Sequence, residues 1–269
     1  MNMTEPLPPQ RPTRRAAELR LIALPGLPLV QEGDDLAALI LEALGSCAEH
    51  LSDGDVLVVA QKIVSKIEGR IRTLNEVIPS PRAIELSNET GKDSRLIELM
   101  LGESNEVRRY SHDVIIVEHR LGFVMANAGI DQSNVLQASG DDTVLLLPRD
   151  PDTSCAALRA TLAERTGISV GVIINDSHGR AWRNGTVGVA IGVAGLPALL
   201  DLRGVGDIYD RKLRITEVGL ADEIASAASL LMGQANERRP VVLVRGIPYA
   251  RREGSARDLV RTREQDLFR

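Results

Sequence analysis

The segment TVLLLPRDPDTSCAALRATLAERTGISVGVIIND, residues 143–176, carries the clearest fold signal in the chain. Its first apolar run has the length of a strand. Asp150 then serves as a helix cap, and Pro151 takes the first position of an amphipathic helix. Gly167 ends the helix, and an all-apolar run follows it. Such strand–helix–strand units build parallel sheets. The segment therefore predicts an α/β or α+β fold.

The sequence on either side predicts further strands and helices. The run VLVVA at residues 56–60 is apolar throughout, which is typical of a strand covered on both faces. In DVIIVEHRLGFVMANAG, residues 113–129, we expect two strands joined by a tight turn near Arg120 to Gly122. Because this hairpin interrupts the alternation of strands and helices, the expected sheet is mixed, with flanking helices. Helices are predicted for EGDDLAALILEALG, capped at Asp34 or Asp35, and for SPRAIELSNETG, SRLIELMLGES and ADEIASAASLLMG, and a late strand for PVVLVRG.

The composition excludes several classes of function. The formal net charge of −5 argues against a general affinity for nucleic acid or an anionic membrane, since both need a basic face. The most apolar run, residues 187–200, is too short and too rich in glycine to span a bilayer, and it could be either core or a subunit interface. Cys47 and Cys155 lack a CxxC neighbour, so the sequence predicts neither a disulfide framework nor a thiolate zinc site. These features favour a cytoplasmic protein.

The chain divides into three parts by composition. Residues 1–18 are rich in proline, arginine and polar side chains, and they predict a flexible N-terminal tail. Residues 19–249 hold the periodic segments and predict one folded domain. Residues 250–269 are charged and without periodicity, so we expect a C-terminal tail or a shortened linker.

Two lysines directly follow the VLVVA strand, in a chain that has four lysines and 28 arginines. Lys62 and Lys66 stand where α/β folds commonly build ligand crevices. A lysine suits a phosphate group as a compact point charge with rotatable donors. The other interpretation is that both lysines lie on a solvated helix face. The sequence contains neither GxxxxGK[ST] nor GxGxxG, so a phosphate site here would be of another kind.

A second candidate site lies in ANAGIDQSN, residues 126–134. Its small residues would let the backbone approach a ligand, and Asp131, Ser133 and Asn134 offer oxygen atoms within one turn. As a lone motif it is weak, because an ordinary Asx-turn more often explains residues such as Asp131 and Asn134.

The third candidate site is IINDSHGRAWRNG, residues 173–185. The apolar strand is expected to deliver Asp176 to its C-terminal end, beside Ser177. Asp131 and Asp176 could together supply the carboxylates of a Mg²⁺ site, whose other ligands would be water and phosphate oxygens. A turn with a surface ion pair is the alternative. His178 has no partner at HExxH spacing, so it is predicted to form local hydrogen bonds rather than to bind metal.

Six segments of the chain together resemble the coenzyme F420-0:L-glutamate ligase family. They occur in the family's order over roughly residues 20 to 250 and are LPGLPLVQEGDDL, DGDVLVVAQKIVSKIEGR, RLGFVMANAGIDQSNV, LLPRDPDTSCAALR, IINDSHGRAWRNG with VGVAIGVAGL, and TEVGLADEIASAASLLMGQANE. The resemblance implies a homodimeric enzyme that joins L-glutamate through γ-linked amides to the deazaflavin coenzyme F420-0. It also implies GTP as co-substrate, with Mg²⁺ or Mn²⁺ and K⁺. The rival interpretations are a two-metal phosphatase or nucleotide hydrolase, and a non-catalytic deazaflavin- or nucleotide-binding protein.

The resemblance also assigns roles to individual residues. It implies Lys66, Asp131 and Asp176 as catalytic groups, and it leaves Lys62 a supporting part. The implied GTP contacts are Leu27, Pro28, Leu29, Val30, Gln61, Lys66, Asn134, Met232, Gly233, Gln234, Ala235, Asn236, Glu237, Arg238 and Arg239. The implied metal ligands are Asp131, Asp176, Ser177 and Gln234. Asn175 stands where the family more often has a hydroxyl residue, and we expect it to tune the metal shell.

Overall fold

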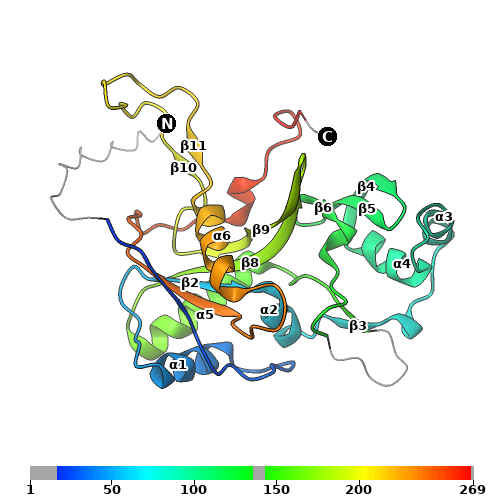
Figure 1. The fold of residues 1–269 in the computed structure, drawn as a ribbon, viewed down its shortest axis with the longest axis horizontal. Coiled ribbons are helices and arrows are strands. Elements are labelled where there is room, and N and C mark those ends of the chain that lie inside the picture. Colours follow the sequence, from blue (N-terminus) through cyan, green and yellow to red (C-terminus); the bar gives the residue numbers. More distant parts are fainter. Residues whose placement is uncertain (1–16, 136–142, 268–269) are drawn as a thin grey trace.

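The computed structural model describes residues 17–135 and 143–267. Figure 1 shows a sheet covered by helices, with a smaller group of helices and strands beside it. The strands are β1 Arg20–Ala23, β2 Val56–Ala60, β3 Ile71–Thr73, β4 Ser104–Ser111, β5 Val114–His119, β6 Val124–Ala126, β7 Thr143–Leu145, β8 Gly171–Arg180, β9 Arg183–Ala194, β10 Leu200–Asp201, β11 Glu217–Val218 and β12 Val241–Arg245. The helices are α1 Leu36–Ser46, α2 Gln61–Ile67, α3 Pro81–Thr90, α4 Ser94–Gly102, α5 Pro151–Thr166 and α6 Leu220–Met232, with 3-10 turns η1 Leu74–Glu76, η2 Asn127–Gly129 and η3 Ala256–Leu259.

The central sheet is mixed, as the sequence predicts. Its strand order is β1-β12-β2-β8-β9, in which β2 and β8 run parallel and the other neighbours antiparallel. Strand β2 is buried on both faces: Leu57 and Val59 pack with α1 and α5, whereas Val56 and Val58 pack with α6. Two helical layers therefore enclose the sheet, and the all-apolar run VLVVA fills both interfaces.

The parallel partner of β8 differs from the sequence expectation. The TVLLL run forms β7, which does not pair with β8 but lies antiparallel to β3. On its other edge, Leu145 exchanges two backbone hydrogen bonds with Asp131, of 2.9 and 2.8 Å. Both edges of β7 are therefore occupied, and β2 takes the place beside β8. Two apolar runs of similar length preceded β8 in sequence, and hydrophobicity alone cannot choose between them.

The local signals for helix boundaries are confirmed. Asp150 caps α5 by accepting a hydrogen bond from the Thr153 backbone N–H, at 3.1 Å. Gly167 ends α5 with φ of 73°, a conformation that glycine adopts without a steric penalty. Asp35, rather than Asp34, caps α1 by accepting from the Ala38 N–H at 3.0 Å.

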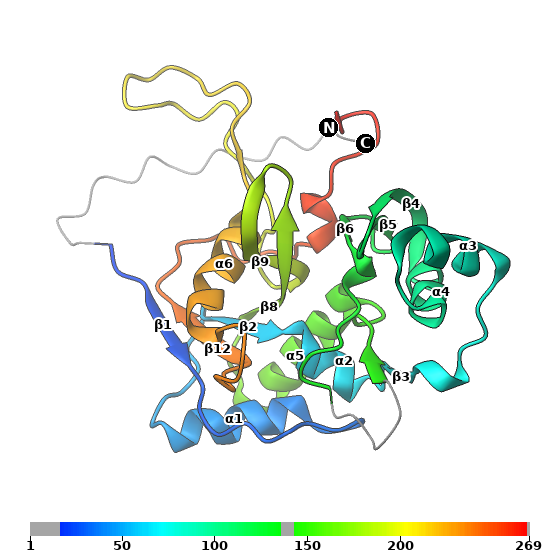
Figure 2. The same cartoon turned by 45° about the vertical axis from the view of Figure 1, so that its right-hand side comes forward.

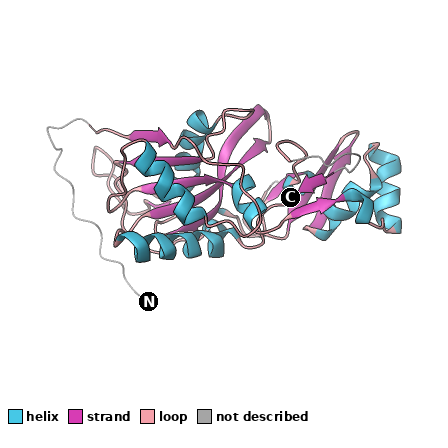
Figure 3. Cartoon of the chain, turned by 90° about the horizontal axis from the view of Figure 1, so that it is seen from below, coloured by secondary structure: helices cyan, strands magenta, loops and turns pink. Residues whose placement is uncertain are grey.

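A separate small core forms beside the sheet between β3 and η2. Helices α3 and α4 pack on the antiparallel sheet β4-β5-β6, around apolar side chains that include Leu86, Ile97 and Val117. Figure 3 shows this group, which we call the insert, extending from one side of the main sheet. Strands β5 and β6 form the predicted hairpin, closed by the Gly122 N–H donating to the His119 carbonyl.

Strand β8 is longer than the sequence predicts. It does not end at Asp176 but runs to Arg180 and turns back as β9, so that the two strands rise above the sheet as a hairpin (Figure 2). The run at residues 187–200 is mostly buried, as part of β9 and the segment after it. The next segment, β10 to β11, projects as an arm that exposes Ile208 and Tyr209.

The two segments that the sequence predicts to be tails are described to different extents. The N-terminal tail falls almost wholly outside the described residues. After Tyr249 the chain forms η3, where the Ala256 side chain is buried against the α6 side of the sheet. No helix among residues 17–135 and 143–267 is long and apolar enough to cross a membrane.

Candidate active site

The candidate site lies where β2 and β8 end their parallel pairing. The last paired residues are Ala60 and Asn175, so that Gln61 and Asp176 follow at the same edge of the sheet. The segment after η2 reaches this edge because Asp131 is anchored to Leu145 by two backbone hydrogen bonds. Carboxyl ends of neighbouring parallel strands commonly form ligand crevices. The fold thus brings the three segments singled out in the sequence to one place.

Asp131 is held by side chains from the first turn of α2. Gln61 is 2% exposed, and its Nε2 donates to Asp131 Oδ2 at 2.5 Å. The Gln61 Oε1 in turn accepts from Ser65 Oγ at 2.9 Å, which fixes the orientation of the amide. Lys62 Nζ lies 2.7 Å from Asp131 Oδ1 and donates to Ser133 Oγ at 3.0 Å. Both oxygens of the Asp131 carboxylate therefore have a donor.

The charges in this cluster affect one another. Burial raises the pKa of Asp131, the nearby Lys62 ammonium opposes that rise, and the Asp176 carboxylate adds to it. Burial and the charge of Lys62 both lower the pKa of Lys66. Two carboxylates and two ammonium groups thus share one partly buried region, which is a frequent property of functional sites.

Lys66 connects α2 to the loop that carries Asn134. Its Nζ donates to the Asn134 carbonyl at 2.7 Å, and the Asn134 side-chain amide lies 3.5 Å from the Ala235 carbonyl as a weak donor. Asn134 has φ of 57°, a left-handed conformation that Asn tolerates better than most residues. The loop after α6, within the predicted nucleotide segment 232–239, is thereby placed beside the lysines.

Asp176 has His178 as its neighbour on the same face of β8. The side chain of Asp176 is 12% exposed, and its Oδ2 lies 3.0 Å from His178 Nε2. Side chains two residues apart on a strand share a face, so this neighbour could have been found from the sequence. The Phe123 ring packs against His178, with ring centroids 5.3 Å apart.

The Asn175 side chain points away from Asp176, and its expected effect on a metal shell stays a prediction. Its Nδ2 donates to Ser229 Oγ at 3.1 Å and contacts Met232 Sδ at 3.4 Å, both on α6. Side chains alternate between the faces of a strand, and the α6 face is opposite to that of Asp176. Asn175 instead holds the end of α6, from which the segment 232–239 departs.

Several predicted residues are near the site without a described contact to its centre. The segment Leu27–Val30 is anchored by buried Val30, and Gly33 just after it donates to the carbonyl of Ile67 at the end of α2. Ser177 lies on the face of β8 opposite to Asp176, by the same alternation. Within the segment 232–239, the Glu237 carboxylate accepts from the Ala235 N–H at 2.8 Å, while Gln234 is exposed. The roles of these residues stay predictions.

The side chains present are compatible with Mg²⁺ or Mn²⁺. Within the described ranges, no group of three or more His, Cys, Asp or Glu side chains has the arrangement of a metal site. Mg²⁺, however, usually binds through one or two carboxylates and completes its shell with water and substrate phosphates. Asp131 and Asp176 are close enough for the charge of one to raise the pKa of the other. This donor set fits a metal that enters together with phosphate.

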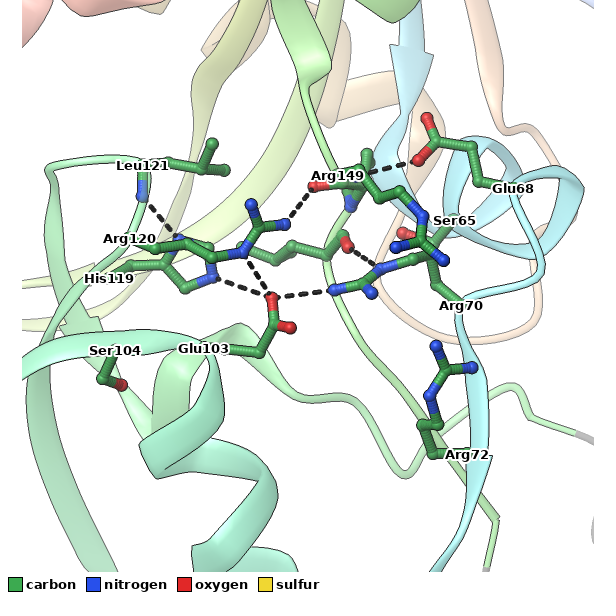
Figure 4. A network of polar contacts seen from close by, with 12 residues as sticks. Ser65, Glu68, Arg70, Arg72, Glu103, Ser104, His119, Arg120, Leu121 and Arg149 are labelled. Carbon is green, nitrogen blue, oxygen red and sulfur yellow. Dashed lines mark hydrogen bonds and ion pairs between the residues drawn. The ribbon is translucent and has the colours of Figure 1, made fainter.

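A buried ionic network that the sequence did not reveal joins the insert to the main body (Figure 4). Glu103, at the end of α4, accepts from Arg120 Nε at 2.9 Å and forms an ion pair with Arg70 at 2.8 Å. Arg70 also donates to the Leu147 carbonyl, at 2.8 Å. The fully buried His119 lies next to the network, and burial lowers its pKa to about 4.

This network is linked to the candidate site by three rings in contact, of which the first two are stacked and the third is tilted. His119 stacks on Phe123 with centroids 5.3 Å apart, and Phe123 packs on His178 beside Asp176. The position of the insert and the position of Asp176 are therefore connected by packed side chains.

Comparison with known proteins identifies the family of the chain. A sequence model described as "F420-0:Gamma-glutamyl ligase" matches residues 26–246, which include every predicted site residue. The chain belongs to this ligase family. Members with the name coenzyme F420:L-glutamate ligase are 51% identical in Methanothermobacter thermautotrophicus and 47% identical in Methanopyrus kandleri. The aligned regions cover 93% of this chain in both cases, and 99% and 98% of those ligases.

A third member of the ligase family supports the same assignment. The coenzyme F420:L-glutamate ligase of Archaeoglobus fulgidus is 46% identical over 91% of this chain and 94% of its own length. The alignments therefore span both the main sheet and the insert. The resemblance noted from the six sequence segments is confirmed, as are the ligase class and the mixed α/β fold.

Proposed function

We propose that this protein is a GTP-dependent ligase that joins L-glutamate to coenzyme F420-0 through γ-linked amide bonds, by way of an acyl phosphate. Membership in the ligase family gives the reaction class. The observation that carries the nucleotide-dependent mechanism is the cluster of Lys62, Lys66, Asp131 and Asp176 at the edge of the sheet. Ammonium groups suit phosphate oxygens, and a pair of carboxylates suits the divalent cation that accompanies a nucleoside triphosphate.

Amide formation from a carboxylate needs activation, because an oxide is a poor leaving group. In the proposed reaction, a carboxylate oxygen of F420-0 forms a bond to the γ-phosphorus of GTP, and the bond to the β,γ-bridging oxygen breaks to release GDP. The amine nitrogen of L-glutamate then attacks the carbonyl carbon, and the bond to the phosphate oxygen breaks. Overall the glutamate ammonium loses two protons, one of which leaves on hydrogen phosphate and one in solution.

The residues of the site have different roles in the proposed reaction. Asp131 and Asp176 would hold Mg²⁺ or Mn²⁺, which would offset the negative charge that develops on the phosphate oxygens. Lys66 would place a fixed positive charge on the same phosphates, and K⁺ is a further cation implied by the resemblance. Gln61 orients Asp131 through its 2.5 Å hydrogen bond. Asn134 and the segment 232–239, with Gln234, would contact the nucleotide, as would Leu27–Val30.

The test is incubation with GTP, Mg²⁺ or Mn²⁺, K⁺, L-glutamate and F420-0, followed by mass spectrometry of the coenzyme. We expect products that carry one or more added glutamate residues, with GDP formed in step. A matched Asp131→Asn variant should form neither product. ATP in place of GTP measures the nucleotide preference.

Two other outcomes would support the rival functions. A nucleotide hydrolase would release phosphate from GTP at the same rate with and without L-glutamate and F420-0. A non-catalytic binding protein would retain the coenzyme without any increase in its mass. Either result would contradict the proposed ligase reaction. We place the reaction in the cytoplasm, where GTP and glutamate are available.

A further inference from the structure

Lys62 is paired with the carboxylate that the proposed function assigns to a metal. Its Nζ lies 2.7 Å from Asp131 Oδ1, while Gln61 occupies Oδ2. The side chains of Lys62 and Asp131 are only 27% and 25% exposed, so solvent screens this pair incompletely. The ammonium thus supplies Asp131 with the positive charge that a divalent cation would otherwise bring.

Binding of a metal ion and of the Lys62 ammonium to the Asp131 carboxylate at the same time is energetically unfavourable. Two cations on one partly buried carboxylate repel each other strongly, because the local dielectric is far below that of water. Lys66 adds a third positive charge nearby, since its Nζ donates to the Asn134 carbonyl while Lys62 donates to the adjacent Ser133. Gln61 is neutral and can stay on Oδ2. The group that must move when a metal arrives is therefore Lys62.

Once displaced, Lys62 has only weak alternatives in the described structure. Its remaining partners are Ser133 Oγ at 3.0 Å and the Ser133 carbonyl at 3.4 Å, which are both neutral. Displacement would thus cost Lys62 its ion pair and leave the ammonium with neutral acceptors only, which is unfavourable in a partly buried place. An anionic ligand that entered with the metal would remove the cost, because the freed ammonium could bind a phosphate oxygen.

We propose that Lys62 is an exchangeable cation on Asp131, which a divalent metal must displace, so that metal binding is coupled to the binding of a phosphate-bearing ligand. The inference rests on the proposed function, because it takes Asp131 as a metal ligand. Lys62 then acts as a positioning residue that keeps the carboxylate compensated before substrates bind and that discourages metal binding without nucleotide.

The choice of lysine fits this role in a chain with 28 arginines among its 32 Lys and Arg residues. An arginine would bind Asp131 through two parallel hydrogen bonds in a fixed fork, which is harder to displace. A lysine is a point charge on a flexible stem and can turn from one acceptor to another.

The test measures Mn²⁺ binding to the enzyme without nucleotide, from the free Mn²⁺ signal in electron paramagnetic resonance. Lys62→Met should bind Mn²⁺ about tenfold or more tightly than wild type, because the metal no longer displaces a charged hydrogen bond. Lys62→Arg should bind Mn²⁺ no better than wild type, and Lys62→Gln serves as a second neutral variant if Lys62→Met folds poorly. Lys92→Met, between α3 and α4 and distant from the site, is the control for the loss of one positive charge and should match wild type.

A second comparison separates this inference from the proposed function. Asp131→Asn combined with Lys62→Met should lose the gained Mn²⁺ affinity. If Lys62→Met and Lys62→Gln bind Mn²⁺ no more tightly than Lys92→Met, the exchange is refuted while the ligase mechanism stands. If the double variant binds Mn²⁺ as tightly as Lys62→Met, Asp131 is not the metal ligand, and both the exchange and the metal assignment fail.

Discussion

Replacing Glu103 by Gln should destabilise the protein by about 3 kcal/mol, because it removes the anion from a buried network. The Glu103 side chain is 11% exposed, and Arg70, its ion-pair partner, is 4% exposed. Removing one partner of such a pair typically costs about 3 to 5 kcal/mol, since the other charge stays buried and uncompensated. Gln keeps one acceptor oxygen, and Arg120 is 34% exposed and can turn to solvent, so the lower end of the range applies.

The pH dependence of this effect has a definite sign. Burial alone would raise the pKa of Glu103, but the Arg120 and Arg70 guanidinium groups outweigh burial and hold it below its ordinary value of 4.5. A carboxyl group with a lowered folded-state pKa stabilises the protein above its unfolded-state pKa, and this contribution is lost as the pH falls through the folded-state value. The difference in free energy of unfolding between wild type and Glu103→Gln should thus be largest at neutral pH and should decrease below about pH 4. Burial lowers the pKa of His119 to about 4, and the Glu103 carboxylate opposes that shift from 3.7 Å. His119 should therefore titrate at a lower pH in Glu103→Gln, and the stability difference is read most simply near neutral pH.

The assay is urea and thermal unfolding followed by circular dichroism, at neutral pH and at a series of lower pH values. A loss of about 3 kcal/mol corresponds to a fall in Tm of roughly 6 to 12 °C for a chain of this size. Glu85→Gln is the matched control, because the pair between Glu85 and Arg82 is exposed on α3 and should contribute little. If Glu103→Gln unfolds at the same temperature as Glu85→Gln, the buried network does not hold the insert in place and the reasoning is refuted.

Three further predictions concern the site and the assembly. Asp176→Asn should lower the ligation rate about a hundredfold or more with an unchanged melting curve, and near-wild-type turnover at saturating metal would remove Asp176 from the site. Lys66→Met should weaken GTP binding about tenfold or more. Lys66→Arg should also slow ligation, because a planar guanidinium cannot reproduce the geometry of an ammonium, and an unchanged rate would make Lys66 an ordinary surface lysine. The protein should have the mass of a homodimer in light scattering at micromolar concentration, and a monomer mass there would contradict the prediction.

The sequence alone determined the features that depend on neighbouring residues. Asp150 is a cap because its side chain meets a backbone N–H three residues further along the chain. The same contact makes Asp35 a cap, although the sequence left Asp34 as an alternative. Gly167 ends α5 because the left-handed conformation it adopts favours glycine, whatever the rest of the fold. The VLVVA run predicted a strand buried on both faces, since all its positions are apolar. The family could be recognised because six sequence segments resemble those of the ligase family and occur in the same order.

Only the tertiary structure decided which of these segments meet. Strand β8 pairs with β2 rather than β7, because both edges of β7 are already occupied by β3 and by Asp131. Gln61 and Asp131 are 70 residues apart, and no local pattern joins an amide at the start of α2 to a carboxylate beyond a 3-10 turn. No local pattern predicts the contacts of Glu103 with Arg70 and Arg120 either. Contacts of this kind form when several loops close at once, and apolar runs of similar length are interchangeable until the burial of the whole core selects one pairing.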